Sequence, residues 1–416
     1  MSEKIARAGI LVIFAVFLMA WPAVAADTIK IAHIDPMSGA FADAGERADK
    51  MLRAVVNEIN AKGGVLGGKK LEVVTLDNKQ SPQESLLMLK KATDEGIHFI
   101  TQGHGSNNAA ALSEAITKIY QRTPEKAVLY LNFSAVDPEL TNDKCNFWHF
   151  RFDSNSDMKV AAIVSYLARQ KSVKKVYLIG QDYAHGRAVR DAARRLLAQK
   201  LPNVKIVGDD LHPTGKVKDF SPYVAKIKAS GADTVITGNW GNNDLGLLVK
   251  AGKEGGLKVN WFTFYAEAGG TPAAIGEAGV DHVYQVSEYH TNIPNSSIEP
   301  FVRKFEKETG MSFYYLRMKT AIEMLAKAIN QAKSADPLKV AKALEGMRYQ
   351  SATGEVWMRP EDHQLMAPLY ISVMTKAGPK LKYKHDVNRS GFGFRTEALI
   401  ALKDSVLPTT CRMARP

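Results

Sequence analysis

Apolar residues along the chain fall into short continuous runs that alternate with stretches of helical periodicity. Thr28–Ile34 is a short apolar run, which predicts a strand, and Glu46–Asn60 places its apolar residues on one stripe, which predicts a helix. The alternation of strand and helix continues through most of the chain. This spacing is typical of parallel sheets that carry helices on both faces, so we predict an α/β fold.

The pattern divides into two successive series of elements. The first continues with strands over Leu71–Leu76, His98–Gln102 and Val128–Asn132 and helices over Ser81–Asp94 and Asn107–Tyr120. The second starts near Asp157, with helices over Met158–Arg169, Arg187–Gln199, Phe220–Ala229 and Asp244–Lys253 and strands over Lys175–Ile179, Val204–Leu211, Thr234–Thr237, Asn260–Phe264 and Val283–Tyr289. Helices around Tyr315–Lys333 and Pro337–Leu344 follow, and then short strands over Gly354–Met358, Leu369–Thr375 and Leu381–Tyr383. Because 416 residues exceed what one hydrophobic core organises, we expect two lobes.

The first 25 residues have the composition of a secretory signal peptide. Lys4 and Arg7 precede an apolar run over Ile10–Ala20, and Ala23-Val24-Ala25 supplies the small residues that a signal peptidase needs. The run is shorter than the roughly 20 residues of a membrane-spanning helix. We therefore expect cleavage after Ala25 and a mature protein in the periplasm.

Charge and cysteine content narrow the class of protein further. The chain has 55 Lys and Arg against 43 Asp and Glu, and this excess is spread without a basic cluster, which argues against nucleic-acid binding. Its two cysteines are Cys145 and Cys411. Two free thiols are one alternative, but an oxidising compartment favours a disulfide that ties the C-terminal tail to the middle of the chain.

The motifs of common enzymes and cofactor sites are absent from the sequence. Gly63–Lys70 resembles a phosphate-binding loop, but it ends in Lys70 in place of Ser or Thr and leads from a helix into a strand. The histidines do not have the spacing of a metal site, and there is no GxSxG nucleophile motif. We expect no catalytic residue, no metal and no cofactor.

Ligands of open α/β sheets bind at the carboxyl ends of the strands, so the strand-to-helix loops are the candidate site. Ser106 stands where a strand gives way to a helix, and its hydroxyl serves either as a helix cap alone or as a cap that also holds an anion. Aromatic residues gather in the same class of loop, which is typical of an apolar small-molecule pocket. They are Phe41, Phe133, Tyr183, Trp240, Phe264 and Tyr265.

Several segments, in order along the chain, resemble the branched-chain amino-acid type of periplasmic solute-binding protein of ABC importers. The segments are Ile31–Gly39, Gly63–Gly68 before a strand that ends in Asp77, Phe133–Thr141, Asp182–Gly186, and Asp219-Phe220 ahead of Ser230–Asp233. The resemblance covers nearly the whole mature chain and implies two doubly wound parallel-sheet lobes joined by a three-crossing hinge, the type I fold. It places the first lobe at 26–150 plus 286–348, the second at 151–285 plus 349–395, and a tail at 396–416.

The resemblance also implies which residues bind the ligand. The family's carboxylate-binding Ser maps to Ser106 or Asn107, and the next loop, which reads Ser134-Ala135-Val136, contributes backbone and a hydroxyl. Val136 replaces a family Thr, so Ser134 is the substitute hydroxyl. In the second lobe, a family Tyr maps to Tyr183, and the loop over the ligand side chain maps to Asn239–Asn243, which contains Trp240 and Asn242.

One departure from the family leaves the ligand open. Tyr265 occupies the position of the acidic residue that pairs with a ligand ammonium, and Glu267 lies two residues further on. With Glu267 pointing inward, the ligand is a branched-chain or related amino acid; otherwise an aromatic or other amine-free carboxylate fits better. The expected partners are this small ligand and the importer's membrane subunits, with the protein as a monomer. A soluble ligand-sensing subunit is the alternative of another class.

Overall fold

A computed structural model describes residues 28–293, 297–378, 381 and 389–416 of the chain. The expected signal peptide with its cleavage site after Ala25 lies outside these residues, as does most of the strand expected over Leu381–Tyr383. Within the described residues, no helix combines the length and the apolar character needed to span a membrane.

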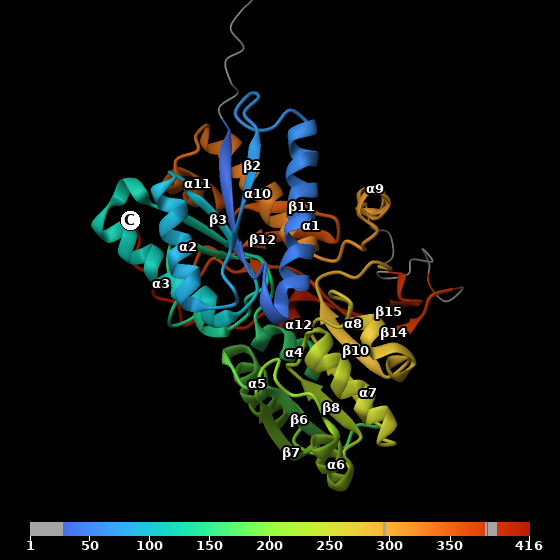
Figure 1. Cartoon of the computed structure of the whole chain (residues 1–416). Helices are drawn as coiled ribbons and strands as arrows, with labels where there is room; N and C mark the ends of the chain where they lie inside the picture. The colour runs from blue at the N-terminus through green and yellow to red at the C-terminus, as the bar shows by residue number, and fades with distance from the viewer. Residues whose placement is uncertain (1–27, 294–296, 379–380, 382–388) are drawn as a thin grey trace, which may run out of the picture.

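The first lobe is built on a five-stranded parallel sheet with strand order β2-β1-β3-β4-β5. Buried Ile31 of β1 pairs with Val73 of β2 on one side and with Phe99 of β3 on the other. Helix α1 packs on α10, α10 on α11, and α2 on α3, around this sheet (Figure 1). The elements are β1 Ile29–Asp35, α1 Ala42–Ala61, β2 Leu71–Asp77, α2 Pro82–Asp94, β3 Phe99–Gln102, α3 Ser106–Arg122, β4 Leu129–Asn132, β5 His149–Arg151, α9 Glu299–Thr309, α10 Leu316–Ala332 and α11 Pro337–Leu344.

The second lobe is built on a seven-stranded sheet with strand order β15-β14-β10-β9-β8-β6-β7. Strands β6 to β10 pair in parallel, whereas β14 and β15 add an antiparallel edge. Separate apolar clusters cover its two faces, one around Leu196 of α5 and one around Leu248 of α7. The elements are α4 Ser156–Leu167, β6 Lys175–Gln181, α5 Ala184–Lys200, β7 Lys205–His212, α6 Ser221–Ser230, β8 Thr234–Thr237, α7 Leu247–Glu254, β9 Asn260–Thr263, α8 Thr271–Ile275, β10 Val283–Ser287, β14 Leu369–Lys376, β15 Phe392–Ile400 and α12 Leu402–Ser405.

Two borders of the lobes differ from those expected. Strands β11 Arg348–Ser351, β12 Gly354–Met358 and β13 Leu365–Met366 form a small antiparallel sheet. Val356 and Met358 of this sheet belong to the apolar core of the first lobe, so 349–367 does not join the second lobe. At the other border, β15 runs to Ile400, which places 396–400 in the second-lobe sheet and not in the tail.

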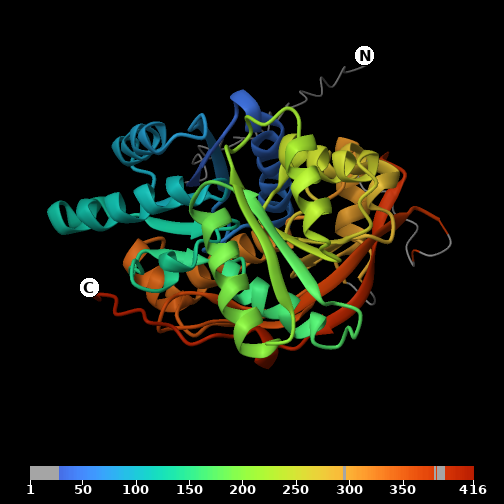
Figure 2. The same cartoon turned by 90° about the horizontal axis from the view of Figure 1, so that it is seen from below.

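The chain passes between the lobes at three places and then returns once more as the tail. The crossings lie between β5 and α4, between β10 and α9, and between β13 and β14. After α12, which packs on α4, the tail runs back to the first lobe (Figure 2). There Thr409 Oγ1 donates to the Thr141 carbonyl over 2.8 Å, and Cys411 forms the expected disulfide with Cys145.

Local signals explain why several elements start and stop as predicted. The Ser81 hydroxyl accepts a hydrogen bond from the Glu84 N–H, and Pro82 occupies the first position of α2. The glycine-rich segment 63–70 is a turn in which Val65 pairs with Lys69, as expected from its place between a helix and a strand. Gly64 has a φ of 72°, and a Cβ there would lie 2.1 Å from the Lys69 carbonyl oxygen, so glycine is required.

Candidate functional site

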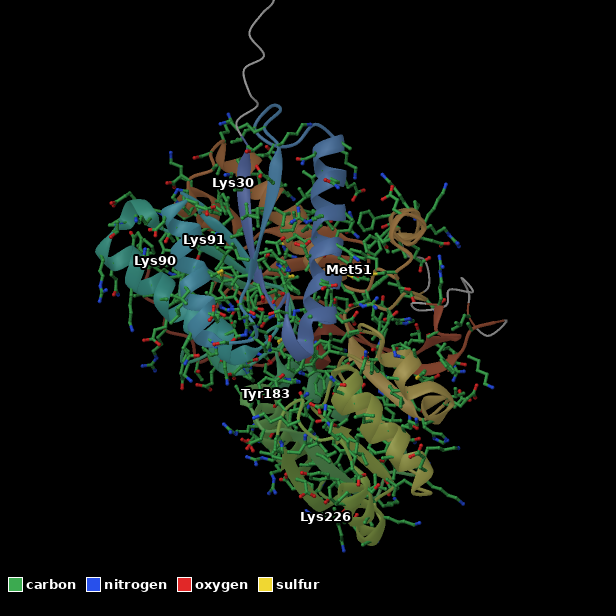
Figure 3. All side chains as sticks on the ribbon, in the orientation of Figure 1. Lys30, Met51, Lys90, Lys91, Tyr183 and Lys226 are labelled. Atoms are coloured by element: carbon green, nitrogen blue, oxygen red, sulfur yellow. A yellow bond between two sulfur atoms is a disulfide. The ribbon has the colours of Figure 1, made fainter. Side chains whose placement is uncertain are left out.

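A cavity of about 90 Å³ lies between the lobes, where loops at the carboxyl ends of both sheets meet. Figure 3 labels Tyr183 at this junction. The lining includes nine of the residues expected from the sequence: Phe41, Ser106, Ser134, Ala135, Val136, Tyr183, Trp240, Asn242 and Tyr265. Four expected residues do not line the cavity: Asn107, which is exposed, and Phe133, Phe264 and Glu267, which are buried elsewhere.

The start of α3 forms one wall of the cavity. Ser106 is the first residue of this helix, so the expectation that its hydroxyl caps the helix is wrong: Gly105 occupies the cap position, and no side chain caps it. A Cβ at Gly105 would lie 2.7 Å from Gln80 Nε2, and its φ is 93°, which explains the glycine. An uncapped helix start presents free N–H groups and the positive end of the helix dipole, which suit a carboxylate.

The next loop of the first lobe uses its backbone differently from the expectation. Asn132 Oδ1 accepts hydrogen bonds from the N–H groups of Ser134 and Ala135, at 3.1 and 2.8 Å. These two N–H groups therefore stabilise the loop and are not free for a ligand. The Ser134 hydroxyl accepts from Arg317 Nη2 over 3.3 Å, which leaves its own hydrogen to donate toward the cavity.

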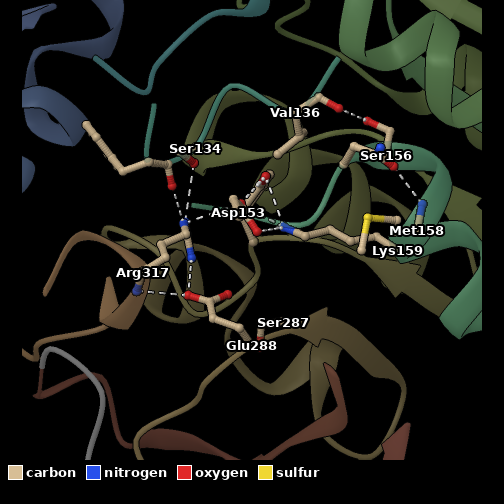
Figure 4. Close-up of polar contacts among 12 residues, drawn as sticks. Ser134, Val136, Asp153, Ser156, Met158, Lys159, Ser287, Glu288 and Arg317 are labelled. Carbon is tan, nitrogen blue, oxygen red and sulfur yellow. Dashed lines mark hydrogen bonds and ion pairs between the residues drawn. The ribbon is translucent and has the colours of Figure 1, made fainter. Parts of the chain in front are cut away.

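Behind this wall lies a buried charge network centred on Arg317 of α10 (Figure 4). Its Nε donates to the Phe133 carbonyl over 2.7 Å, and its Nη1 donates to Glu288 Oε1 over 2.8 Å. Asp153 Oδ2 lies 3.3 Å from Nε. Burial lowers the pKa of Arg317, but Asp153 and Glu288 outweigh it, so the pKa is raised and the guanidinium stays charged.

Tyr265 connects this network to the second lobe. Its hydroxyl donates to Asp153 Oδ2 over 3.0 Å and accepts from Lys159 Nζ over 3.2 Å. Arg317 Cζ lies 5.4 Å from the centre of the Tyr265 ring and 4.4 Å from that of Tyr315. Burial raises the pKa of Tyr265, so it donates as a neutral hydroxyl. Asp153 and Arg317 thus contact cavity-lining residues of both lobes, Tyr265 in the second lobe and Tyr315 in the first.

A second buried network fixes the floor of the cavity in the first lobe. His104 Nδ1 lies 2.9 Å from Asp35 Oδ2, and its Nε2 lies 3.0 Å from the Tyr315 hydroxyl. Burial raises the pKa of Asp35, but the charge and hydrogen bonds of His104 outweigh it and lower the pKa. Asp35 is therefore an anion committed to His104.

Aromatic residues form the second-lobe wall and reach across the cleft. The Trp240 indole donates through Nε1 to the Tyr183 hydroxyl over 2.8 Å. The Trp240 ring also lies 4.8 Å, centre to centre, from that of Phe41 in the first lobe. Burial raises the pKa of Tyr183, which keeps its hydroxyl neutral. The two rings therefore bring the lobes into contact at the cavity.

Glu267 points away from the cavity because its carboxylate is already satisfied. The Thr291 N–H and hydroxyl both donate to Oε1 over 2.9 Å, and Gln285 Nε2 donates to Oε2 over 3.2 Å. Burial raises its pKa to about 7, and the Thr291 donors offset only part of that effect. Of the two alternatives left open by the sequence, the structure therefore excludes an inward-pointing Glu267, which was a candidate ligand-binding residue, and Tyr265 lines the cavity.

The sequence was compared with models of known protein families. A family model described as periplasmic binding protein matches residues 28–379.

The chain belongs to the periplasmic binding protein family.

Known relatives of this periplasmic binding protein match it over nearly its full length. It is 30% identical to the Leu/Ile/Val-binding protein homolog 4 of Brucella abortus over 404 residues, which cover 94% of each chain. Among solved structures, the leucine-, isoleucine-, valine-, threonine- and alanine-binding protein of Brucella ovis, in a closed conformation, is 28% identical with a TM-score of 0.82, covering 94% of this chain and all of that one. A solute-binding protein of Rhodopseudomonas palustris in complex with 3,4-dihydroxybenzoic acid shares the fold at 20% identity and a TM-score of 0.75, covering 90% of this chain and 97% of that one.

Several residues that line the cavity of this periplasmic binding protein were not predicted from the sequence. His104 and Asp244 stand in loops that the strand pattern had marked as candidates, but nothing in their residue type singled them out. Tyr314 and Tyr315 lie in the connection between helices α9 and α10, and the expectation of ligand contacts at strand ends does not apply to such a connection. Within the described residues, no group of His, Cys, Asp or Glu side chains is placed to hold a metal ion.

Proposed function

We propose that this protein is the solute-binding component of an ABC importer and encloses a small carboxylate ligand between its lobes. One observation carries the proposal: the uncapped start of α3 with Ser106 lines the same interlobe cavity as Tyr183 and Trp240 of the second lobe. The helix start binds the carboxylate, and the second-lobe rings cover the rest of the ligand. Contacts to both lobes favour the closed state over the open one.

The first candidate ligand is a branched-chain or related amino acid. The relatives that match the chain over most of its length carry names of this ligand class, including a Pseudomonas aeruginosa protein that binds leucine, isoleucine, valine, threonine and alanine. The small volume of the cavity suits a single small molecule and not a peptide.

An aromatic carboxylate is the second candidate, because aromatic rings supply much of the wall. The cavity is lined by Phe41, Tyr183, Trp240, Tyr265 and Tyr315. Offset and edge-to-face contacts with such rings stabilise an aromatic ligand. Glu267 does not line the cavity, so its carboxylate does not repel a ligand that lacks an amine.

We also propose where and with what the protein acts. It is exported to the periplasm after cleavage behind Ala25, works as a monomer without catalysis, and delivers its ligand to the importer's membrane subunits. A soluble sensing subunit would share the site, so transport assays in a strain that lacks the gene separate the two roles: a sensing subunit would leave uptake of the ligand unchanged.

The experiment that tests the site is ligand binding by the purified mature protein. Thermal shift against aliphatic amino acids, aromatic amino acids and aromatic acids identifies the class, and calorimetry gives the affinity. A bound ligand stabilises the folded protein by about 2.7 kcal/mol at a hundredfold excess over its dissociation constant. Absence of any shift across all three classes contradicts the proposal.

A further inference from the structure

We propose that the Asp244 carboxylate in the second lobe binds a protonated amino group of the ligand, so that the ligand is an amino acid held at both ends. This inference rests on the proposed function and names the ligand class for the same cavity. It assigns the role of ammonium partner to a residue that the family pattern did not indicate.

Asp244 is placed at the cavity by an unusual turn. The chain forms a single π-helical turn over Gly241–Gly246, directly after Trp240 and before α7. Such turns are uncommon and occur often at functional sites. Asp244 is only 1% exposed, yet it lines the cavity. Asp244 is therefore a buried residue in the wall of the cavity.

Among the described residues, only one oxygen of this carboxylate has hydrogen-bond partners. Oδ2 accepts hydrogen bonds from the Gly215 N–H over 2.8 Å and from Gln181 Nε2. Oδ1 is buried and has no hydrogen-bond partner among the described residues. A buried acceptor without a partner is rare in proteins, so this oxygen is where a donor of the ligand belongs.

The charge of the site favours an ammonium as that donor. Both partners of Asp244 Oδ2 are neutral, and the described residues that line the cavity include no Lys or Arg. The wall also contains two histidines: His185 is neutral because burial lowers its pKa to about 3, and His104 is already paired with the Asp35 carboxylate over 2.9 Å. A buried carboxylate without a cation is unfavourable, and a cationic group on the ligand removes that penalty.

The remaining acidic residues near the cavity do not offer this role. Asp43 lines the cavity, but it is exposed and pairs with Arg47 Nε over 2.9 Å. Both oxygens of Glu267 accept hydrogen bonds away from the cavity. An amino acid with its carboxylate at α3 and its ammonium at Asp244 spans the cleft, because α3 belongs to the first lobe and Asp244 to the second.

Ligand pairs test this assignment on the unaltered protein. The pairs are L-leucine with 4-methylpentanoate and L-phenylalanine with 3-phenylpropionate, in which the second member lacks only the amine. We expect the amino acid of at least one pair to bind about 10- to 100-fold more tightly, the effect of one hydrogen bond between charged groups. Binding of both members with equal affinity overturns the role of Asp244 and leaves the carboxylate site intact. Failure of all four to bind, together with the aromatic acids, contradicts the proposed function itself.

A variant then locates the amine. Asp244→Asn keeps the shape and the acceptor for Gly215 but removes the charge, so the preference for the amino acid should disappear while the amine-free acid keeps its affinity. Asp43→Asn and Glu267→Gln are matched controls that should keep the preference. A preference that survives in Asp244→Asn overturns the assignment. The hydroxy acid 2-hydroxy-4-methylpentanoate separates the donor groups: binding as tight as that of leucine shows a hydroxyl contact and contradicts the ammonium.

Discussion

The rings of Phe41 and Trp240 lie 4.8 Å apart, centre to centre, although they belong to different lobes. Phe41 also packs toward Gly215, where an added Cβ would lie 3.4 Å from the Phe41 ring. This contact between two protein side chains joins the lobes at the cavity. It therefore contributes to the stability of the closed state itself.

Phe41→Ala should shift the protein toward the open state. An aromatic pair contributes about 0.5–1.5 kcal/mol beyond its buried area, so ligand affinity should fall by about 2- to 10-fold. Calorimetry measures the affinity, and small-angle scattering with ligand measures the opening. Leu87→Ala, at an exposed position of α2, is the control and should change neither. Unchanged affinity in Phe41→Ala would mean that the ring contact does not contribute to closure.

Ser106→Ala combined with Ser134→Ala should weaken binding of a carboxylate ligand. Both side chains line the cavity, and a hydrogen bond to a charged group contributes about 1.5 kcal/mol or more. Asn107→Ala is the matched control, since Asn107 is the next residue of α3 but is exposed and outside the cavity. Calorimetry with the ligand identified by thermal shift measures the affinity of each variant. Equal affinities of the double variant and the Asn107→Ala control would contradict the proposed carboxylate site.

Arg317→Met should destabilise the fold strongly. The substitution removes the cation beside buried Glu288 and leaves Asp153 with Lys159 as its remaining cation, and breaking a buried pair in this way costs about 3–5 kcal/mol. Urea unfolding measures the change. Arg303→Met, which removes an exposed pair with Glu299 on α9, should cost less than about 1 kcal/mol. Similar losses of unfolding free energy in the two variants would show that the buried Arg317 network does not stabilise the fold more than an exposed ion pair does.

Glu267 should make stability depend on pH. Its pKa is about 7 in the folded protein against a usual value of 4.5, so between these values the folded state keeps a proton that the unfolded chain releases. The free energy of unfolding therefore falls as the pH rises through this window, by up to about 3 kcal/mol. Urea unfolding at pH 4 and pH 8 should show this loss in the unaltered protein relative to Glu267→Gln. If the difference in unfolding free energy between the two proteins is the same at pH 4 and pH 8, the pKa of Glu267 is not raised.

Replacement of Cys145 and Cys411 by Ser should lower stability and free the tail. The chain-entropy model gives up to about 5 kcal/mol for closing so long a loop, because the disulfide restricts mainly the unfolded chain. Thermal unfolding of the double variant should match that of the reduced unaltered protein. An unfolding temperature that does not respond to reduction would show that the tail contributes nothing through this bond.

The sequence predicted the fold well because strands and helices of buried sheets carry strong periodic signals. Segment 71–76 and the cap at Ser81 needed only local rules, and both are present. Strand β15 was not predicted, since it is an edge strand whose residues from 395 to 399 are mostly half-buried or exposed. The small sheet β11–β13 was placed in the wrong lobe because its partner, the first-lobe core, comes from distant parts of the chain.

The site was predicted less completely than the fold. The sequence indicated which loops form the site, but it did not indicate which side chains of those loops face the cavity. Tyr265 and Glu267 follow β9 two residues apart, yet only Tyr265 lines the cavity, because Thr291 and Gln285 draw the Glu267 carboxylate away. Those partners lie about twenty residues further along the chain. Likewise, Asp244 Oδ1 lacks a hydrogen-bond partner in the part of the chain that the structure describes, although Oδ2 has two. Periodicity and loop position alone do not encode such orientations.

The return of the tail turns much of the polypeptide into a covalent ring. Cys145 and Cys411 are 266 residues apart in sequence, and the segment between them contains every strand of the second-lobe sheet. A protease that cuts one hinge strand inside this ring leaves both fragments bonded through sulfur. A nicked molecule would migrate as one species until a reducing agent is added, and its two halves could still meet around a ligand.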